Sequence, residues 1–305
     1  MDVGGVKVVD SGTGLGTPRY VAINDSNGGL YVAAADMRAV EQGLDTEVVR
    51  GEVGGGLAEW IVIDGNLSEA TITAVLKEAG RKGKKVIFEP TSTPKSTRLF
   101  PASTIHNPPP VYPLTPLYAA TPNLLELTSL YTACMSRDLF STTLPWWPCL
   151  DSFLISSEFT DAITQLSHRC SLDLQSDGLV TKAIQLLPYI PRLFIKLGSK
   201  GCLVVRILEN WEQKEEGEGR KGGYVNAGLR VRWNGKIEVR HFPAEEVKGD
   251  VVGVNGAGDT FLGVLAAGLV RGDKVEDAVE RAQRAAVLTL GTREAVSDMV
   301  RGLAW

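Results

Sequence analysis

The chain has 305 residues, of which 44% are apolar, and a formal net charge of -4. This length and apolar content suffice for one large hydrophobic core, alone or with a small appendage. The acidic balance argues against a general nucleic-acid binder or a protein that binds acidic membranes. No run reaches the roughly 18 apolar residues of a membrane span, and the first residues lack a basic-then-apolar signal pattern. We therefore expect a soluble, cytoplasmic protein with neither a nucleic-acid nor a membrane partner.

The cysteines and histidines carry no recognisable motif. Cys134, Cys149, Cys170 and Cys202 show no Cys-x-x-Cys spacing, and the three histidines show no metal-binding pattern. Scattered cysteines in a chain without a signal pattern are typical of reduced, structural thiols. We expect neither disulfides nor a metal site built from cysteine and histidine.

The first part of the chain predicts strands. Residues 6–9 suggest a short strand, and residues 11–16 are rich in glycine. A dinucleotide-binding turn is not favoured, because residues 19–23 predict a strand where that turn needs a helix N-terminus. Residues 20–23 and 30–35 flank a turn rich in asparagine and glycine, which is typical of a β-hairpin. Its small residues and polar tip favour a flap over a strand pair inside a sheet.

The next segment predicts a strand–helix–strand unit. Residues 60–63 and 85–88 are nearly continuous apolar runs, and Ser68 is a candidate N-cap for a helix that ends near Gly83. Such strands are buried on both faces, which indicates a parallel sheet covered by helices, and ligands collect at the carboxyl ends of its strands. The polar residues at those ends are Asp64, Asn66, Glu89 and Lys95, and our substrate-side candidates are Asp64, Asn66 and Lys95. The alternative for each is a turn or cap residue.

A second helix start follows a proline-rich loop. Pro122 and the acidic Glu126 suit the first turn of a helix, and the Asn-x-x-Glu spacing places Asn123 and Glu126 on one helix face. Oxygen ligands of this kind suit magnesium and phosphate. The bare pattern is common, and its alternative is helix capping.

Two further buried strands are predicted at residues 193–196 and 202–205. A tight turn from Gly198 to Gly201 joins them. Residues 209–223 are charged and rich in glycine, which predicts a mobile insertion.

Residues 251–261 are the most informative stretch of the chain. A β-branched run breaks on glycines and continues into a helix over residues 261–269. Free backbone N–H groups at a helix start favour an anion, and small side chains let a phosphate approach the backbone. Asp259 is a carboxylate beside this anion site, which suits a general base that takes a proton from an attacking hydroxyl. The alternative is that Asp259 only offsets the helix dipole.

The last predicted helix begins at a capping-box pattern. Asp273 and Glu276 have the required spacing, with aspartate in place of serine or threonine. The alanine-rich helix that follows continues to about Leu290. Gln283 lies on this helix.

The sequence Asn-Gly-Ala-Gly-Asp-Thr-Phe at residues 255–261 resembles the C-terminal signature of the PfkB (ribokinase-like) carbohydrate and nucleoside kinases. The resemblance spans roughly residues 17 to 300. It implies a three-layer α/β/α fold with a mostly parallel sheet and a small β lid, here the hairpin at residues 17–36. It also implies that Asp259 is the catalytic base. The implied anion hole consists of Asn255, Gly256, Ala257 and Gly258.

The same resemblance implies ATP and Mg²⁺ as cofactors. Asn123 and Glu126 match the family motif that helps to place magnesium. Gly198 and Gly201 match a family turn near the nucleotide, and Gln283 lies where the family often has an asparagine near the adenine. Many members have an aspartate, associated with a monovalent cation, at the position of Gly253, so this resemblance leaves a monovalent-cation requirement open.

Residues 20–37, 64–67, 88–92 and 121–123 resemble most the eukaryotic pseudouridine kinases of this family. This implies phosphorylation of pseudouridine to pseudouridine 5′-phosphate, a homodimer formed through the lid, and a pseudouridine-5′-phosphate glycosidase as partner. The alternatives are a kinase for another sugar or nucleoside such as ribose or adenosine, or a non-catalytic nucleotide-binding remnant.

We expect residues 1–305 to form a single kinase domain that is N-terminally incomplete. Family members carry a longer segment before the lid, with a substrate-binding aspartate and a Gly-Gly motif. Gly4 and Gly5 are no convincing substitute, since no strand precedes them. Impaired activity of this chain alone is therefore expected.

Overall fold

The computed structural model describes residues 14–24, 30–44, 46–209, 224–225 and 229–303. The strand predicted at residues 6–9 and most of the insertion predicted at residues 209–223 lie outside these ranges. Within the described part of the chain, no helix combines the length and apolar character that a bilayer span requires. The four cysteines are free, as predicted.

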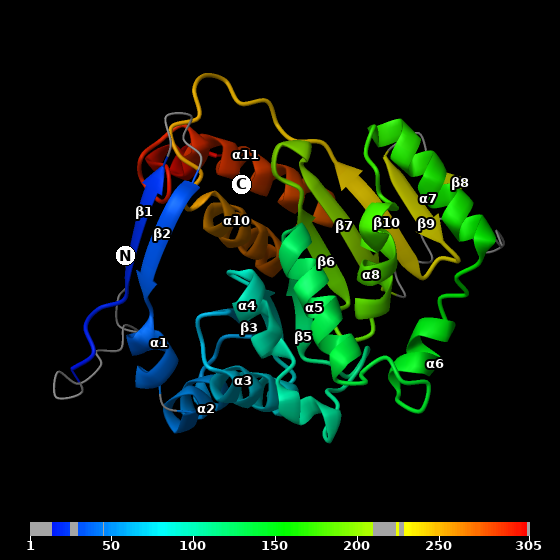
Figure 1. The fold of residues 1–305 in the computed structure, drawn as a ribbon, viewed down its shortest axis with the longest axis horizontal. Coiled ribbons are helices and arrows are strands. Elements are labelled where there is room, and N and C mark those ends of the chain that lie inside the picture. Colours follow the sequence, from blue (N-terminus) through cyan, green and yellow to red (C-terminus); the bar gives the residue numbers. More distant parts are fainter. Residues whose placement is uncertain (1–13, 25–29, 45, 210–223, 226–228, 304–305) are drawn as a thin grey trace.

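The centre of the molecule is an eight-stranded sheet with the order β3-β4-β5-β6-β7-β10-β9-β8 (Figure 1). The neighbouring strands from β3 to β6 are parallel. The remaining neighbours, β6–β7, β7–β10, β10–β9 and β9–β8, are antiparallel. The predicted α/β class is confirmed. The same sheet has a parallel half and an antiparallel half. The strands are β3 Trp60–Asp64, β4 Lys85–Glu89, β5 Leu117–Ala120, β6 Arg192–Lys196, β7 Cys202–Ile207, β8 Tyr224–Val225, β9 Arg230–Trp233 and β10 Ile237–Phe242.

Helices cover both faces of this sheet (Figure 1). In β6, Leu193 and Ile195 pack into one apolar cluster with residues of α3, α5, α7 and α8, whereas Phe194 packs into a second cluster with α10 and α11. Successive strand side chains point to opposite faces, so a continuous apolar run fills both layers. The helices are α1 Arg38–Gly43, α2 Thr46–Gly55, α3 Glu69–Lys82, α4 Thr93–Ser96, α5 Leu124–Ser136, α6 Trp146–Asp151, α7 Ser157–Cys170, α8 Leu179–Leu186, α10 Ala257–Arg271 and α11 Val275–Leu290.

The boundaries of α3 follow from its caps. The Ser68 hydroxyl accepts the backbone N–H of Thr71 at 3.1 Å, which satisfies one of the free amides at the helix start. Gly83 ends the helix with φ of +66°, a left-handed conformation that glycine adopts without a Cβ clash. The predicted strand–helix–strand unit is therefore confirmed at both helix ends.

The prediction that Asp273 caps α11 was wrong. The N-cap is Lys274, which makes no side-chain capping hydrogen bond. The Asp273 carboxylate instead accepts a hydrogen bond from Arg281 Nη1 at 2.6 Å, on the second turn of the same helix. An ion pair with a guanidinium competes for the oxygen atoms that a capping interaction would use.

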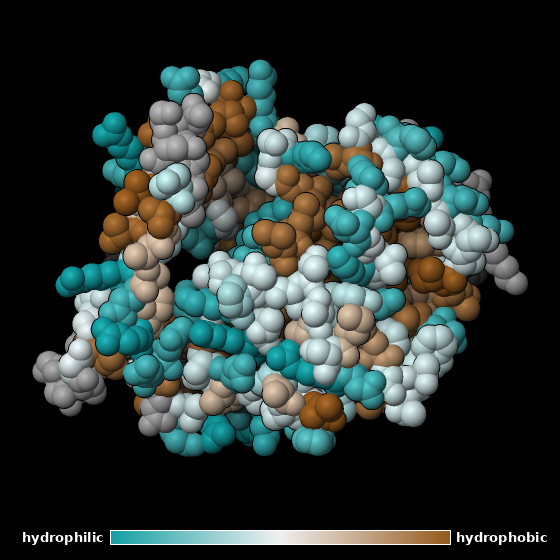
Figure 2. Space-filling model, viewed as in Figure 1, coloured by the Kyte–Doolittle hydropathy of each residue, from teal (hydrophilic) through white to brown (hydrophobic). Residues whose placement is uncertain are grey.

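Strands β1 (Arg19–Asn24) and β2 (Leu30–Asp36) form a separate antiparallel hairpin that stands beside the main sheet (Figure 1). This agrees with the predicted flap. Val21 and Ile23 alternate along β1, so they lie on one face of the hairpin, and both are more than half exposed. Figure 2 shows this apolar surface in brown.

Candidate active site

Polar side chains gather at the carboxyl ends of the four parallel strands. Asp64 ends β3 and pairs in register with Glu89, which ends β4. Thr121 directly follows β5 and donates a hydrogen bond to Glu89 Oε2. Lys196 ends β6, and its Nζ lies 2.8 Å from Glu89 Oε1. The sheet edge predicted to collect ligands therefore carries a connected polar cluster.

The three substrate-side candidates form one hydrogen-bonded chain. Asn66 Nδ2 donates to Asp64 Oδ2 at 2.7 Å, and Lys95 Nζ donates to Asn66 Oδ1 at 2.6 Å. Arg98 fixes the loop, because its Nη1 donates to the carbonyl oxygens of residues 65, 66 and 67, and its Nη2 pairs with Glu41. The structure thus brings these candidates together, and their role toward a substrate stays a prediction.

Asn123 and Glu126 form a reciprocal capping box at the start of α5. Asn123 Oδ1 accepts the backbone N–H of Glu126 at 2.9 Å, and Glu126 Oε2 accepts the backbone N–H of Asn123 at 2.8 Å. The helix begins at Leu124, so Asn123 is the N-cap. The capping alternative is therefore realised, and a magnesium role must be compatible with it.

The glycine turn before α10 is fixed at Gly256. Its φ is +77°, and a β-carbon at this position would lie 1.8 Å from the Ala295 carbonyl oxygen. Only glycine meets both conditions. Thr260 donates its backbone N–H to the Gly256 carbonyl at 2.8 Å, so the turn leads directly into the helix. The first amides of α10, including those of Ala257 and Gly258, have no partner within the helix and favour an anion.

Asp259 is the third residue of α10, and its side chain is exposed to solvent. It lies on the same helical turn as the amides of the anion site, with Asn255 just before the turn. The predicted signature thus places an exposed carboxylate beside a helix N-terminus. Its role as a general base stays a prediction.

A cavity of about 670 Å³ opens beside this turn. A volume of this size is within the range of cofactor and small-ligand sites. It brings together the predicted residues from the strand turn, the glycine signature and the last helix, although they lie far apart in the sequence. The predicted residues among its lining are Gly198, Gly201, Ala257, Gly258 and Gln283. Gln283 Nε2 donates to the Pro243 carbonyl at 3.1 Å, which fixes its orientation at the wall.

Sequence reasoning missed Lys196, which lines the same cavity. As the last residue of an apolar strand, it carries no motif of its own. The available signal was its position, since it lies two residues before the predicted Gly198–Gly201 turn. Glu89 was noted at a strand end but was not placed among the site candidates.

The turn at the cavity wall is held by its neighbours. Gly201 has φ of +92°, and a β-carbon there would lie 2.1 Å from the Phe242 carbonyl oxygen. His241 Nε2 lies 2.7 Å from the Lys200 carbonyl oxygen, which can only accept, so Nε2 carries the proton. His241 Nδ1 is buried and has no hydrogen-bond partner among the described residues. Burial lowers the pKa of His241 below its usual 6.5.

Because of His241, we expect the folded protein to lose stability at acidic pH. The unfolded chain binds the His241 proton more readily than the folded chain, so stability rises with pH in this range. The contribution is fully present above the unfolded pKa of 6.5 and is lost as pH falls from there through the lower folded pKa. Denaturant unfolding from about pH 8 to about pH 5 should show this decline. His241→Gln should flatten it, and an equal slope in both proteins would contradict the assignment.

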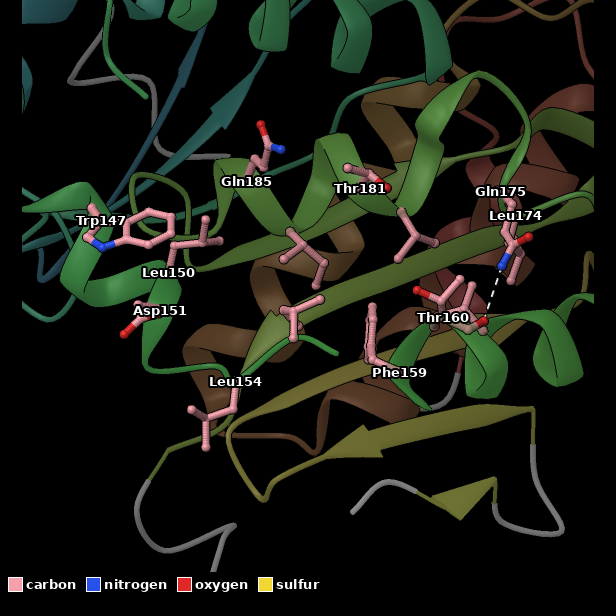
Figure 3. A pocket seen from close by; sticks show the side chains of 14 residues that line it. Trp147, Leu150, Asp151, Leu154, Phe159, Thr160, Leu174, Gln175, Thr181 and Gln185 are labelled. Atoms are coloured by element: carbon pink, nitrogen blue, oxygen red, sulfur yellow. Dashed lines mark hydrogen bonds between the residues drawn. The ribbon is translucent and has the colours of Figure 1, made fainter. Parts of the chain in front are cut away.

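A second cavity of about 620 Å³ lies between α6, α7 and α8 (Figure 3). Apolar side chains such as Leu154 and Phe159 form most of its wall. Gln175 is already engaged there, because its Nε2 donates to the Thr160 carbonyl at 3.1 Å. None of the predicted site residues lines this cavity.

The sheet order, the two helical layers and the polar edge next to a helix N-terminus define a ribokinase-like α/β/α protein. A solved adenosine kinase from Sinorhizobium meliloti superposes with a TM-score of 0.54 at 12% identity, covering 94% of this chain and 65% of that one. Arabidopsis thaliana ribokinase, solved with ribose and ATP, gives a TM-score of 0.52 at 16% identity, covering 92% of this chain and 66% of that one. At these identities the likeness establishes the fold.

Residues 163–300 match the family described as pfkB family carbohydrate kinase, and over these residues the match agrees with the PfkB resemblance predicted from the signature. A curated protein of Schizosaccharomyces pombe, named pseudouridine-metabolizing bifunctional protein, is 30% identical over 286 residues. Those residues are 93% of this chain and 35% of that protein. The chain thus spans about a third of the curated relative and just under two thirds of these two solved kinases.

Proposed function

We propose that this chain transfers the γ-phosphoryl group of ATP to a hydroxyl group of a sugar or nucleoside. The observation that carries the proposal is the cavity beside α10, where the Gly198–Gly201 turn, the start of α10 at Ala257 and Gly258, and Gln283 meet. The polar cluster at the strand ends lies next to it, through Lys196. Solved kinases of this fold with bound ATP or ADP support ATP as the donor.

The residues have separate tasks in the proposed reaction. The acceptor hydroxyl attacks the γ-phosphorus as the bond to the β-phosphate oxygen breaks, and ADP leaves. Asp259 accepts the hydroxyl proton, and the backbone amides at residues 256–258 stabilise the charge on the phosphoryl oxygens. The substrate-side candidates Asp64, Asn66 and Lys95 orient the acceptor, which removes much of the entropic barrier.

The Asn123/Glu126 pair at the start of α5 is compatible with magnesium. Mg²⁺ keeps several water ligands and usually needs only one or two protein carboxylates in addition to substrate phosphates. Glu126 uses Oε2 for the capping box, and its Oε1 takes no part in that interaction. Glu126 and Asn123 would hold the ion through water, and the bound ion would neutralise phosphate charge. Mg²⁺ itself remains part of the proposal.

Glu126→Gln separates the magnesium role from the capping role. Glutamine also suits the third position of a capping box, so the helix start should persist while one negative charge is lost. We expect the Mg²⁺ concentration for half-maximal activity to rise several-fold, with little change in the midpoint of thermal unfolding. Glu126→Ala is the control for capping and should lower stability by about 1 kcal/mol. An unchanged Mg²⁺ requirement in Glu126→Gln would leave capping as the sole role of the pair.

For the substrate, we propose pseudouridine, which would yield pseudouridine 5′-phosphate. The support is the printed name of the Schizosaccharomyces pombe relative together with its 30% identity. The test is a panel of pseudouridine, uridine, adenosine and ribose, incubated with Mg-ATP and analysed by product mass and ADP release, with Asp259→Asn as the blank. Phosphorylation of another member of the panel would reassign the substrate. Nucleotide binding without any phosphorylation would favour the non-catalytic alternative.

We further propose that the lid hairpin forms a homodimer contact. Val21 and Ile23 share one hairpin face with Val32, and their exposed fractions are 61%, 58% and 48%. A contiguous exposed apolar face of this kind marks an association surface. In sedimentation velocity, the unmodified chain should be a dimer and the Ile23→Glu variant a monomer. Equal sizes of the two proteins would refute the contact. We also propose a pseudouridine-5′-phosphate glycosidase as partner; the relative's printed name gives that protein a second function in pseudouridine metabolism without naming it.

A further inference from the structure

The side chain of Lys196 is held in one place by a buried carboxylate. Its Nζ donates to Glu89 Oε1 at 2.8 Å, and the Glu89 side chain is only 6% exposed. Thr121 donates to the other oxygen, Glu89 Oε2. Burial raises the pKa of Glu89, and the Lys196 charge opposes this shift. Both carboxylate oxygens are therefore engaged, which orients the ammonium group at the end of β6.

The ammonium group of Lys196 also lies beside the start of α10. A β-carbon built on Gly258 would lie 3.6 Å from Lys196 Nζ, so the ammonium is close to the first turn of this helix and only the missing side chain of Gly258 separates them. Lys196 and Gly258 both line the cavity of about 670 Å³. The Lys196 side chain keeps 21% of its surface exposed, which leaves it accessible from that cavity.

This arrangement brings two positive groups together. A helix N-terminus carries a partial positive charge and normally attracts acidic side chains, so an ammonium beside it is repelled. An anion between the two positive groups reverses the sign of the interaction. The ammonium has three donor hydrogens, and one hydrogen bond to Glu89 leaves two for that anion.

We propose that Lys196 binds a phosphate group of the nucleotide, with Glu89 as its positioning residue. The inference rests on the proposed phosphotransferase function and assigns one more residue to that site. Lysine suits this task as a compact point charge on a flexible stem. The helix amides and the ammonium then bind the same anion from two sides. Adenosine has no phosphate, so its affinity should not depend on Lys196.

The test measures equilibrium binding by calorimetry, with adenosine, AMP, ADP and ATP titrated into the full chain. Lys196→Met should raise the Kd for the phosphorylated ligand that Lys196 contacts by about 10- to 100-fold, the range expected for a hydrogen bond to a charged group. The Kd for adenosine should stay unchanged. Lys182→Met is the matched control, because Lys182 donates to Thr128 Oγ1 at 3.2 Å outside the cavity.

A second variant guards against misfolding. Removing Lys196 alone leaves Glu89 buried without its cation, so the double variant Lys196→Met with Glu89→Gln removes both charges and keeps the Thr121 hydrogen bond. It should fold and show the same selective loss of phosphate affinity. Glu89→Gln alone should retain Lys196 and lose less affinity than Lys196→Met.

The outcomes separate this inference from the function on which it rests. If Lys196→Met left ATP binding unchanged, the proposed role of Lys196 would be wrong, and the proposed function would be unaffected. Equal weakening of adenosine and ATP also overturns it, because the change would then reflect the shape of the cavity. Absence of nucleotide binding by the unmodified chain overturns both the inference and the proposed function.

Discussion

Asp259→Asn is expected to lower kcat by about 10²- to 10⁴-fold, the usual contribution of a positioned general base. The substitution keeps the size of an exposed side chain at the third position of α10 and removes its negative charge, and with it the ability to accept a proton. The Kd for ATP should change little, because the backbone amides of the anion site remain in place. Steady-state kinetics with the best acceptor and calorimetry with ATP measure the two quantities independently.

Asp277 supplies a matched control on the neighbouring helix. It is the third residue of α11, as Asp259 is the third residue of α10, and its side chain is also exposed. Asp277→Asn should cost about 0.3 to 1 kcal/mol of stability through the helix dipole and leave kcat unchanged. If Asp259→Asn behaved in the same way, Asp259 would only offset the dipole and the assigned base would be wrong.

Local signals predicted the parallel half of the fold well. The β3–α3–β4 unit has a serine cap, a left-handed glycine and two continuous apolar strands, and each of these points to the same structure. The glycine signature and the Gly198–Gly201 turn were recognisable for the same reason, since each is a short contiguous pattern. The cavity confirms that these distant patterns meet.

In the antiparallel half the β9–β10 hairpin was not predicted, although its signal is in the sequence. Asn234 and Gly235 connect β9 to β10, with φ of 48° and 64°. Positive φ at two consecutive residues is the type I′ hairpin geometry, for which Asn-Gly is the strongest sequence signal. The dipeptide by itself predicts the β9–β10 hairpin, whereas the pairing of β10 with β7 depends on the tertiary fold.

The part of the site that the sequence conceals consists of long-range contacts. Glu89 and Lys196 are separated by 107 positions, and neither has a spacing that reveals the other. Their meeting follows from the parallel order β4-β5-β6, which brings the ends of these strands to one edge. Conversely, the Asn123/Glu126 spacing was visible at once, but spacing alone could not separate a metal ligand from the capping box that the structure contains.

Gly256→Ala is expected to have a large structural effect on the site, although it adds a single methyl group. The β-carbon would lie 1.8 Å from the Ala295 carbonyl oxygen, and the backbone is left-handed with φ of +77°. The left-handed conformation costs a non-glycine residue about 1 to 2 kcal/mol, and overpacking adds about 1 to 3 kcal/mol. The turn must therefore shift, and the amides of the anion site shift with it. Denaturant unfolding should show a loss of about 2 to 5 kcal/mol, together with weaker ATP binding.

Gly263→Ala tests whether this effect belongs to the turn or to any glycine of α10. Gly263 lies in the helix interior and is exposed, and a β-carbon added there would have no described atom within 4 Å beyond its own helix backbone and chain neighbours. Alanine there should stabilise the protein by about 0.5 to 1 kcal/mol, because glycine loses more backbone entropy in a helix. The two substitutions add the same methyl group to the same helix region and should act in opposite directions. Equal stability and unchanged ATP affinity in Gly256→Ala would mean that the anion site does not depend on this turn.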